Sequence, residues 1–346
     1  MISLTFLVLP FLPSTNLFVL VGFVIGERNL YLSVLGYAML ISNGILALYK
    51  VKPVLVKIFV VILFLVYSVK STHRSSQWRS EDTLFHSGLR VCPNNAKIHY
   101  NIAKISHDTQ IAIGHYHQAI RLWPRYEHAM NNLGNIMKNM HQYDQAEQLF
   151  HQALDISPTF AASWMNLGIV QSAQKKYEQA ETSYHKALSL RHEYPDCHYN
   201  LGTLYLKLKQ HDLAVEAFTK AIDQNHQHFG AYTNLVILLD ELGHYDIAEN
   251  SALEACEIFP EKPDFYFHLA NIYGKANRYE EAEEMYTKAI DINPHIPLYH
   301  INLGVLYHRW KKLDQAKDKY NKALDLDPKS KSARANLARL PKNVEN

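Results

Sequence analysis

Asparagine returns at one position of a regular period along most of this sequence. The row comprises Asn101, Asn132, Asn166, Asn200, Asn234, Asn302 and Asn336, with His268 at the single place where asparagine is missing. An asparagine side chain offers both a hydrogen-bond donor and an acceptor. A row of such amides could bind the backbone of an extended peptide, whatever its side chains. The competing interpretation is that asparagine occupies this position for local packing reasons.

Other side chains offer less chemistry. The sequence has no nucleophile elbow, no phosphate-binding loop and no metal-ligand motif. The close histidine pairs His115/His117 and His226/His228 do not indicate a zinc site, because such a site needs more converging ligands. We expect both pairs at or near helix ends, in contact with solvent. Before Ser80 the only acidic residue is Glu27, which excludes a catalytic carboxylate pair from that part. We therefore predict no catalytic residue and no metal site in this chain.

The period that carries the asparagines is 34 residues long. Leucine follows the asparagine position at Leu133, Leu167, Leu201, Leu235, Leu269, Leu303 and Leu337. Glycine or a substitute comes next, and two alanines flank an aromatic residue further on in five of six units. Proline closes four units. This pattern is that of the tetratricopeptide repeat, in which each unit is a pair of antiparallel helices.

Each residue type in the pattern has a physical role. Small residues let the two helices approach closely, and proline ends a helix because it cannot continue one. We expect the aromatic side chain to fill the gap between neighbouring units, and stacking to bury the apolar faces. The sequence predicts repeats over residues 96–338: one irregular unit about three residues short between its helices, six regular units, and a partial helix as cap. A tail, 339–346, follows.

The first 72 residues differ sharply from the rest. Thirteen of the sixteen residues in 54–69 are Val, Leu, Ile or Phe, which outweighs the roughly 3 kcal/mol cost of one lysine at mid-helix. We predict transmembrane helices at about 2–13, 30–49 and 54–69, and a junction over 73–95. The distribution of Lys and Arg does not fix the orientation.

The overall composition excludes few classes of protein. A formal net charge of +2 in 346 residues is too small to indicate nucleic-acid binding. The three cysteines, Cys92, Cys197 and Cys256, are expected to be small buried thiols. The predicted fold is all-α: C-terminal transmembrane helices of a polytopic membrane domain, followed by a tetratricopeptide repeat superhelix.

Several segments resemble a known family. They are GERNLYLSVLGY (26–37), the junction WRSEDTLFHSGLRVCPNNAKIHYNIAK (78–104), and AMNNLGNIM, WMNLGIVQ, YPDCHYNLG and LYHRW within the repeats. They resemble the transmembrane and tetratricopeptide repeat-containing (TMTC) protein O-mannosyltransferases, most closely the fourth member. The asparagine row itself resembles the ladder in the superhelix of the O-linked N-acetylglucosamine transferase.

The resemblance implies a location, a reaction and a donor site. Its members lie in the endoplasmic reticulum membrane with the repeats in the lumen, and they transfer mannose from dolichyl-phosphate mannose to cadherin-type acceptors. The membrane domain would be of the glycosyltransferase C type. By the same resemblance, Arg28 would lie near the donor phosphate, with Glu27 and Tyr31 as neighbours. Ser33-Val34 departs from the family, which has Pro-Ser there.

Two functions from different classes remain open. The first is the C-terminal part of an O-mannosyltransferase, whose repeats bind the acceptor protein; the family's catalytic acidic loop has no match in this chain, so we expect no mannose transfer by the chain alone. The second is a non-catalytic, membrane-anchored scaffold for protein–protein interaction. A cytosolic repeat adaptor would require the opposite membrane orientation.

Overall fold

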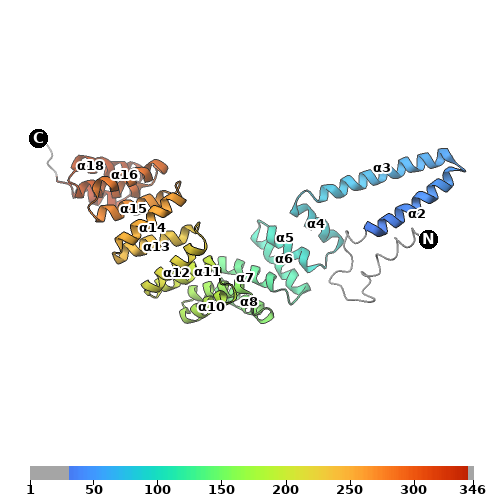
Figure 1. Cartoon of the computed structure of the whole chain (residues 1–346), viewed down its shortest axis with the longest axis horizontal. Helices are drawn as coiled ribbons and strands as arrows, with labels where there is room; N and C mark the ends of the chain where they lie inside the picture. The colour runs from blue at the N-terminus through green and yellow to red at the C-terminus, as the bar shows by residue number, and fades with distance from the viewer. Residues whose placement is uncertain (1–30, 342–346) are drawn as a thin grey trace. The chain divides into compact units, whose positions relative to one another are not determined.

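The computed structural model describes residues 31–341, and every regular element within this range is an α-helix (Figure 1). The chain divides into two compact units, one up to Asn94 and one from Asn95. The two units are described separately below. The all-helical class and the repeat architecture predicted from the sequence are confirmed.

The first unit contains three described helices. They are α2 (Tyr31–Tyr49), α3 (Pro53–Gln77) and α4 (Glu81–Val91). Proline at the first position of α3 suits a helix start, because its missing N–H would have no intrahelical partner there. Ser80 begins α4 with a capping box, in which its side chain accepts from the backbone N–H of Thr83. The helix α3 ends at Gln77, so it runs beyond the predicted end of the transmembrane helix at Val69 and into the segment expected as the junction.

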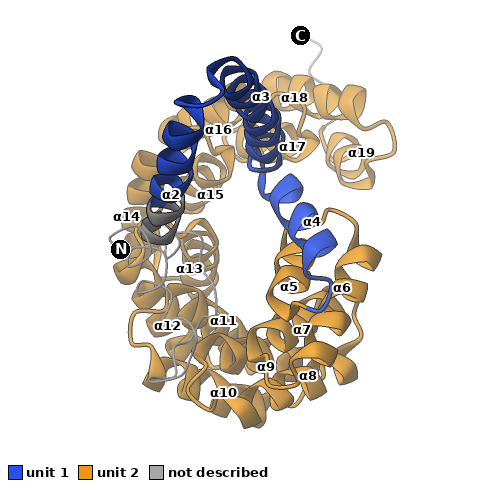
Figure 2. Ribbon diagram, turned by 90° about the vertical axis from the view of Figure 1, so that its right-hand side faces the viewer, with its two compact units in different colours: residues 1–94 blue, residues 95–346 orange. Residues whose placement is uncertain are grey.

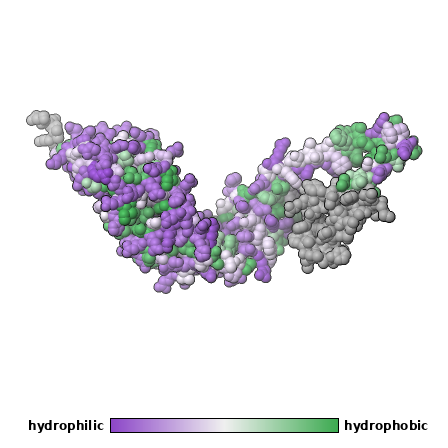
Figure 3. All heavy atoms as spheres, in the orientation of Figure 1, coloured by the Kyte–Doolittle hydropathy of each residue, from purple (hydrophilic) through white to green (hydrophobic). Residues whose placement is uncertain are grey.

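One described helix is long and apolar enough to cross a membrane. It is α3, with 25 residues and no burial in its most apolar stretch. In α2 the apolar stretch, Ala38–Tyr49, is shorter. Figure 3 shows hydrophobic surface on the α2–α3 hairpin and a mainly hydrophilic surface on the repeats. The helix predicted at 2–13 lies outside the described residues, so a polytopic domain remains a prediction.

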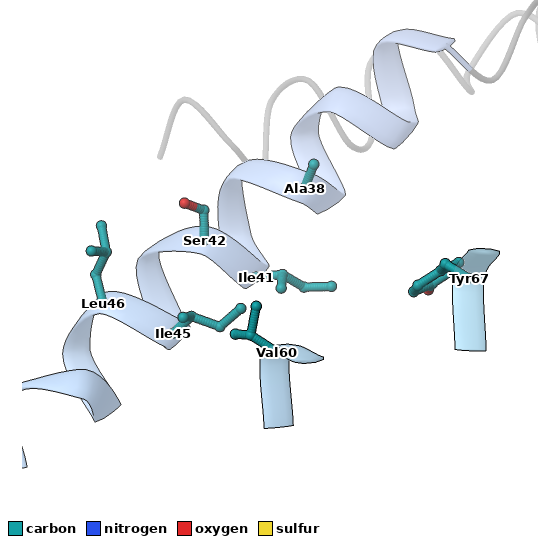
Figure 4. A pocket seen from close by; sticks show the side chains of 7 residues that line it. All are labelled: Ala38, Ile41, Ser42, Ile45, Leu46, Val60 and Tyr67. Carbon is teal, nitrogen blue, oxygen red and sulfur yellow. The ribbon is translucent and has the colours of Figure 1, made fainter. Parts of the chain in front are cut away.

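The two helices of the hairpin line an open apolar hollow of about 640 Å³. Five residues of α2 and two of α3 line it, as Figure 4 shows: Ala38, Ile41, Ser42, Ile45, Leu46, Val60 and Tyr67. Its walls are almost entirely hydrocarbon, as suits a surface that faces lipid or another apolar helix.

The second unit is a row of helix pairs. The pairs are α5 (Ala96–Ile105) with α6 (Thr109–Leu122), α7 (Glu127–Asn139) with α8 (Tyr143–Ile156), α9 (Ala161–Ala173) with α10 (Tyr177–Leu190), α11 (Pro195–Lys207) with α12 (His211–Gln224), α13 (Phe229–Leu242) with α14 (Tyr245–Ile258), α15 (Pro263–Lys275) with α16 (Tyr279–Ile292), and α17 (Pro297–Arg309) with α18 (Leu313–Leu326). The short helix α19 (Lys331–Ala338) follows the last pair and packs on α17 and α18.

In four pairs the glycine that follows the periodic leucine lies against the aromatic residue of the same pair. A Cβ added to Gly134 would lie 2.7 Å from the ring of Phe150, and one added to Gly304 would lie 2.6 Å from Tyr320. We expected the aromatic residue to fill the gap between neighbouring units. That expectation stays a prediction; within its own unit the ring edge lies against the glycine, which has no side chain to displace it.

The turn between the two helices of a regular unit requires a left-handed residue. Gly243 supplies it after α13 with a φ of 79°. The other five regular units place non-glycine residues in this conformation: His141, Lys175, Lys209, Asn277 and Lys311. A side chain in the left-handed region costs roughly 1–2 kcal/mol, so five turns of the superhelix carry backbone strain.

The irregular first unit is short within its first helix. The helix α5 has 10 residues where α7 has 13, whereas α6 has 14 residues like the second helices of the other units. The missing residues therefore belong to the last turn of α5, and not to the connection that follows it. Ala112, Tyr116 and Ala119 on α6 are buried and keep the packing pattern of the regular units.

The first helix of each pair lies on the inner side of the superhelix (Figure 2). Inner helices of neighbouring units contact one another, as α7 does with α9 and α15 does with α17. Two of the three cysteines, Cys197 and Cys256, are buried, and burial raises the pKa of their thiols to about 12 and about 11. Cys92 is exposed, so the expectation of burial is wrong there, because Cys92 lies just past the end of α4.

Candidate peptide-binding face

The asparagine row lies on the inner helices, one residue before the buried leucine of each unit. The leucines at this position point into the core; Leu133 and Leu167 are almost fully buried. Since successive helical residues point about 100° apart, the asparagine stands beside the core on the flank of the helix. Most members of the row are half-buried, and Asn166 is buried.

The N-terminal part of the row is tied into a chain of hydrogen bonds. Asn132 Nδ2 donates to the hydroxyls of Tyr100 and Tyr116, at 3.2 and 3.3 Å. Asn131 Nδ2 donates to Asn132 Oδ1, and Asn131 Oδ1 accepts from Asn166 Nδ2 at 3.1 Å. These bonds link three units, so the amides of Asn132 and Asn166 hold the superhelix together.

The C-terminal part is tied in a similar way. Asn302 Nδ2 donates to Asn271 Oδ1 at 3.2 Å, and the hydroxyl of Tyr286 donates to the same oxygen at 2.5 Å. Burial raises the pKa of the Tyr286 hydroxyl, which keeps it protonated and able to donate. Asn302 therefore also links its unit to the preceding one.

The centre of the row is different. Asn200 on α11 and Asn234 on α13 are half-buried, and neither side chain has a hydrogen-bond partner in the described chain. Their amides are therefore free to bind a ligand. Asn101 and Asn336, at the two ends of the superhelix, also lack a side-chain partner there. The structure thus divides the predicted row into amides used internally and amides that are free.

His268 interrupts the row beside this centre. Burial lowers the pKa of its imidazole, although the nearby carboxylates of Asp264 and Asp240 act in the opposite direction. The imidazole is therefore neutral near pH 7. A neutral imidazole has one donor and one acceptor nitrogen. His268 can therefore offer the same hydrogen-bonding groups as an asparagine amide, but from a ring of different shape.

At most junctions a glutamate of one unit makes an ion pair or a hydrogen bond with a side chain of the next unit. Lys176 Nζ lies 2.8 Å from Glu147, and Arg278 holds both oxygens of Glu249 at 2.8 and 2.9 Å. In each case the cation belongs to the unit after the glutamate. The Tyr205 hydroxyl donates to Glu181 at 2.9 Å in the same manner.

The junction between α12 and α13 lacks such a contact. The equivalent positions there carry Val215 and Leu239, both packed into the apolar core. The two free amides, Asn200 and Asn234, stand on either side of this junction. This junction, which His228 Nε2 and Asp196 Oδ1 also cross at 3.4 Å, thus lies between the two free inner amides.

Other predicted residues are placed as follows. Arg28 and Glu27 lie outside the described residues, and Tyr31 begins α2, so the proposed donor site stays a prediction. His115 Nδ1 lies 2.8 Å from His99 Nδ1, and His228 caps α13 by accepting from the backbone N–H of Ala231. In the described range no three His, Cys, Asp or Glu side chains come together to hold a metal ion.

Sequence reasoning missed two residues of this face. Asn131 is the hub of the N-terminal network; the doublet Asn131-Asn132 in the sequence was the available signal. Arg309 lines a pocket on the inner face with Asn271 and Asn302. Its position, 34 residues after Lys275, was also visible in the sequence.

The superhelix of helix pairs with this inner face defines a tetratricopeptide repeat protein. Family models described as "Tetratricopeptide repeat" match residues 128–157, 159–227, 263–296 and 297–330. Among solved structures, the C-terminal part of a repeat-containing protein from Cytophaga hutchinsonii has a TM-score of 0.60 at 16% identity, covering 70% of this chain and 99% of that one. Pseudomonas aeruginosa PilF has a TM-score of 0.51 at 18% identity, covering 61% and 96%. Both show the fold alone.

Curated relatives point to one family within that class. The chain is 40% identical over 145 residues to mouse "Protein O-mannosyl-transferase TMTC1", covering 40% of this chain and 15% of the relative. It is 49% identical over 105 residues to human "Protein O-mannosyl-transferase TMTC4", covering 30% and 14%. The resemblance to the TMTC family is confirmed, with TMTC4 among the most similar members. The matches span about a seventh of the relatives' length.

Proposed function

We propose that this chain is the repeat-bearing part of a membrane protein O-mannosyltransferase, and that its inner face holds the acceptor polypeptide in an extended form. The curated relatives carry the name of this activity. The reaction would use dolichyl-phosphate mannose as donor and cadherin-type proteins as acceptors, in the endoplasmic reticulum with the repeats in the lumen. The helix α3 would anchor the repeats beside the membrane where the lipid donor lies.

The observation that supports acceptor binding is the pair of free amides, Asn200 and Asn234. An amide can donate to a peptide carbonyl and accept from a peptide N–H at once. The two groups lie one repeat apart on the inner helices α11 and α13, so one extended chain could meet both. Neither amide makes an internal hydrogen bond, so both are available to such a chain.

The first test is a binding measurement on the full chain in detergent micelles, with an unfolded cadherin-type domain as the probe. The double variant Asn200→Ala, Asn234→Ala should bind roughly thirtyfold more weakly, because two net hydrogen bonds of about 1 kcal/mol each are lost. Its thermal unfolding should be nearly unchanged, because neither amide has an internal partner. The matched control is Asn250→Ala, Asn321→Ala, which removes two exposed amides from the outer helices α14 and α18.

Unaltered binding by the double variant would show that Asn200 and Asn234 do not bind the acceptor. A second measurement addresses the reaction: mannose transfer from labelled dolichyl-phosphate mannose to the same domain, by this chain and by a version extended upstream with a relative's membrane domain. Transfer only by the extended version would support the division between catalysis and acceptor binding. Binding without transfer in either would favour a non-catalytic scaffold.

A further inference from the structure

A polar pocket of about 310 Å³ opens on the inner face near the C-terminal end of the superhelix. Residues of α13, α15, α16 and α17 line it, so it spans three consecutive units. Asn302 of the asparagine row forms part of its wall. A peptide backbone that followed the row past Asn302 would therefore place a side chain at this pocket.

The hydrogen bonds already made within the pocket determine what remains for a ligand. Asn271 Oδ1 is occupied by two donors, from Tyr286 and Asn302. The Asn271 amide nitrogen has no acceptor in the described chain, so it is left as a donor. Arg309 uses one guanidinium nitrogen in a long, 3.3 Å bond to Asn277 and keeps its other N–H groups. The pocket thus offers mainly donors.

The charges in the pocket do not cancel. Lys275 Nζ lies 2.7 Å from Asp240 Oδ2, which pairs these two groups. The second oxygen, Asp240 Oδ1, is buried without a hydrogen-bond partner and is out of a ligand's reach. Arg309 has no carboxylate within ion-pair distance among the described residues, so the pocket carries one uncompensated positive charge.

We propose that this pocket binds an acidic side chain, aspartate or glutamate, of the polypeptide held on the inner face. Arg309 would bind the carboxylate through two parallel N–H donors, the arrangement that makes arginine–carboxylate pairs strong and directional. The Asn271 amide nitrogen would donate to one carboxylate oxygen. This inference rests on the proposed acceptor binding, and it adds a preference for acidic segments that the amides alone would not give.

The test uses the full chain in micelles and short fluorescent peptides that differ at one central residue: glutamate, glutamine, lysine or phosphoserine. The glutamate peptide should bind roughly tenfold more tightly than the glutamine peptide at low salt. Arg309→Gln should abolish this ratio and leave the affinity for the glutamine peptide unchanged. The control Arg339→Gln removes an exposed arginine outside the pocket, just after α19, and should preserve the ratio.

A second variant is expected to act in the opposite direction. Asp240→Asn removes the partner of Lys275 and adds one free cation to the pocket, so it should strengthen binding of the glutamate peptide several-fold. Because this is a gain, it cannot arise from misfolding. A preference for lysine, or weaker glutamate binding by Asp240→Asn, would overturn the proposal, as would tighter binding of phosphoserine than of glutamate.

The outcomes separate this inference from the proposed function. Equal binding of the glutamate and glutamine peptides, with both weakened by the Asn200→Ala, Asn234→Ala variant, would reject the acidic pocket and keep acceptor binding. Failure of every peptide and of the unfolded domain to bind would reject both.

Discussion

The unit formed by α13 and α14 differs from the other regular units in the side chains that pack between its two helices. Elsewhere a glycine or alanine on the first helix faces an aromatic ring on the second, as Gly202 faces Phe218. In the α13–α14 unit, Val236 and the small Ala252 occupy these positions, and both are fully buried. The larger side chain thus lies on α13 rather than on the second helix, and the backbones of this pair are in less close contact than those of the other pairs.

The same unit also differs at its turn and at its junction. Its turn has Gly243 where the others have strained residues, and at its junction with α12 Val215 and Leu239 replace the glutamate and its partner found at the α8–α9, α10–α11 and α14–α15 junctions. It also contributes one of the two free inner amides, Asn234. In this unit a free inner amide thus coincides with a junction that lacks the glutamate contact.

The largest expected effect tests the exchange of volume. Val236→Gly should destabilise the protein by about 3 kcal/mol, because it leaves a cavity and adds a glycine to a helix. Ala252→Phe should cost about 1–3 kcal/mol by overpacking. The double variant recreates the pattern of the other units, so its cost should be about 2 kcal/mol less than the sum of the two.

Urea unfolding of the four proteins measures this coupling. The exposed variant Thr219→Gly on α12 serves as the control for the helix propensity of glycine. Additive effects of Val236→Gly and Ala252→Phe on the free energy of unfolding would show that the two side chains do not compensate each other's volume between α13 and α14.

The next largest effect separates the hydrogen-bonded asparagines of the row from the free ones by their contribution to stability. Asn166→Ala should lower the free energy of unfolding by about 1 kcal/mol, because it removes a buried hydrogen bond to Asn131. Asn234→Ala should change it by much less, because its amide has no internal partner. Thermal unfolding of the two variants, side by side, measures the difference; equal losses would mean that both amides serve the fold.

The smallest effect concerns the turns. Lys209→Gly should stabilise the protein by up to about 1 kcal/mol, because glycine tolerates the φ of 59° that strains lysine there. Gly243→Ala should destabilise it by a similar amount, for the converse reason. The opposite signs are the test: a loss of stability in both variants would indicate that the Lys209 side chain contributes contacts that outweigh its strain.

Much of the fold followed from periodicity. The spacing of Leu133, Gly134 and Ala146 located the helix pairs, because side chains that recur with the unit must meet equivalent neighbours. The sequence failed in details that depend on which neighbour is met. The irregular unit is short in α5 rather than in the connection after it, and Cys92 is exposed; neither the period nor the residue type specifies these features.

What the sequence alone determined is the repeat itself: the pairing of helices, the small residues at their close approach, and an asparagine in nearly every unit. What the tertiary structure decided is the use of each asparagine. Asn166 and Asn234 occupy the same position of the period, yet one is bound to Asn131 and the other is free. The reason is that an amide's partners come from the preceding unit, some 30 residues away, and whether they reach it depends on how the two units pack.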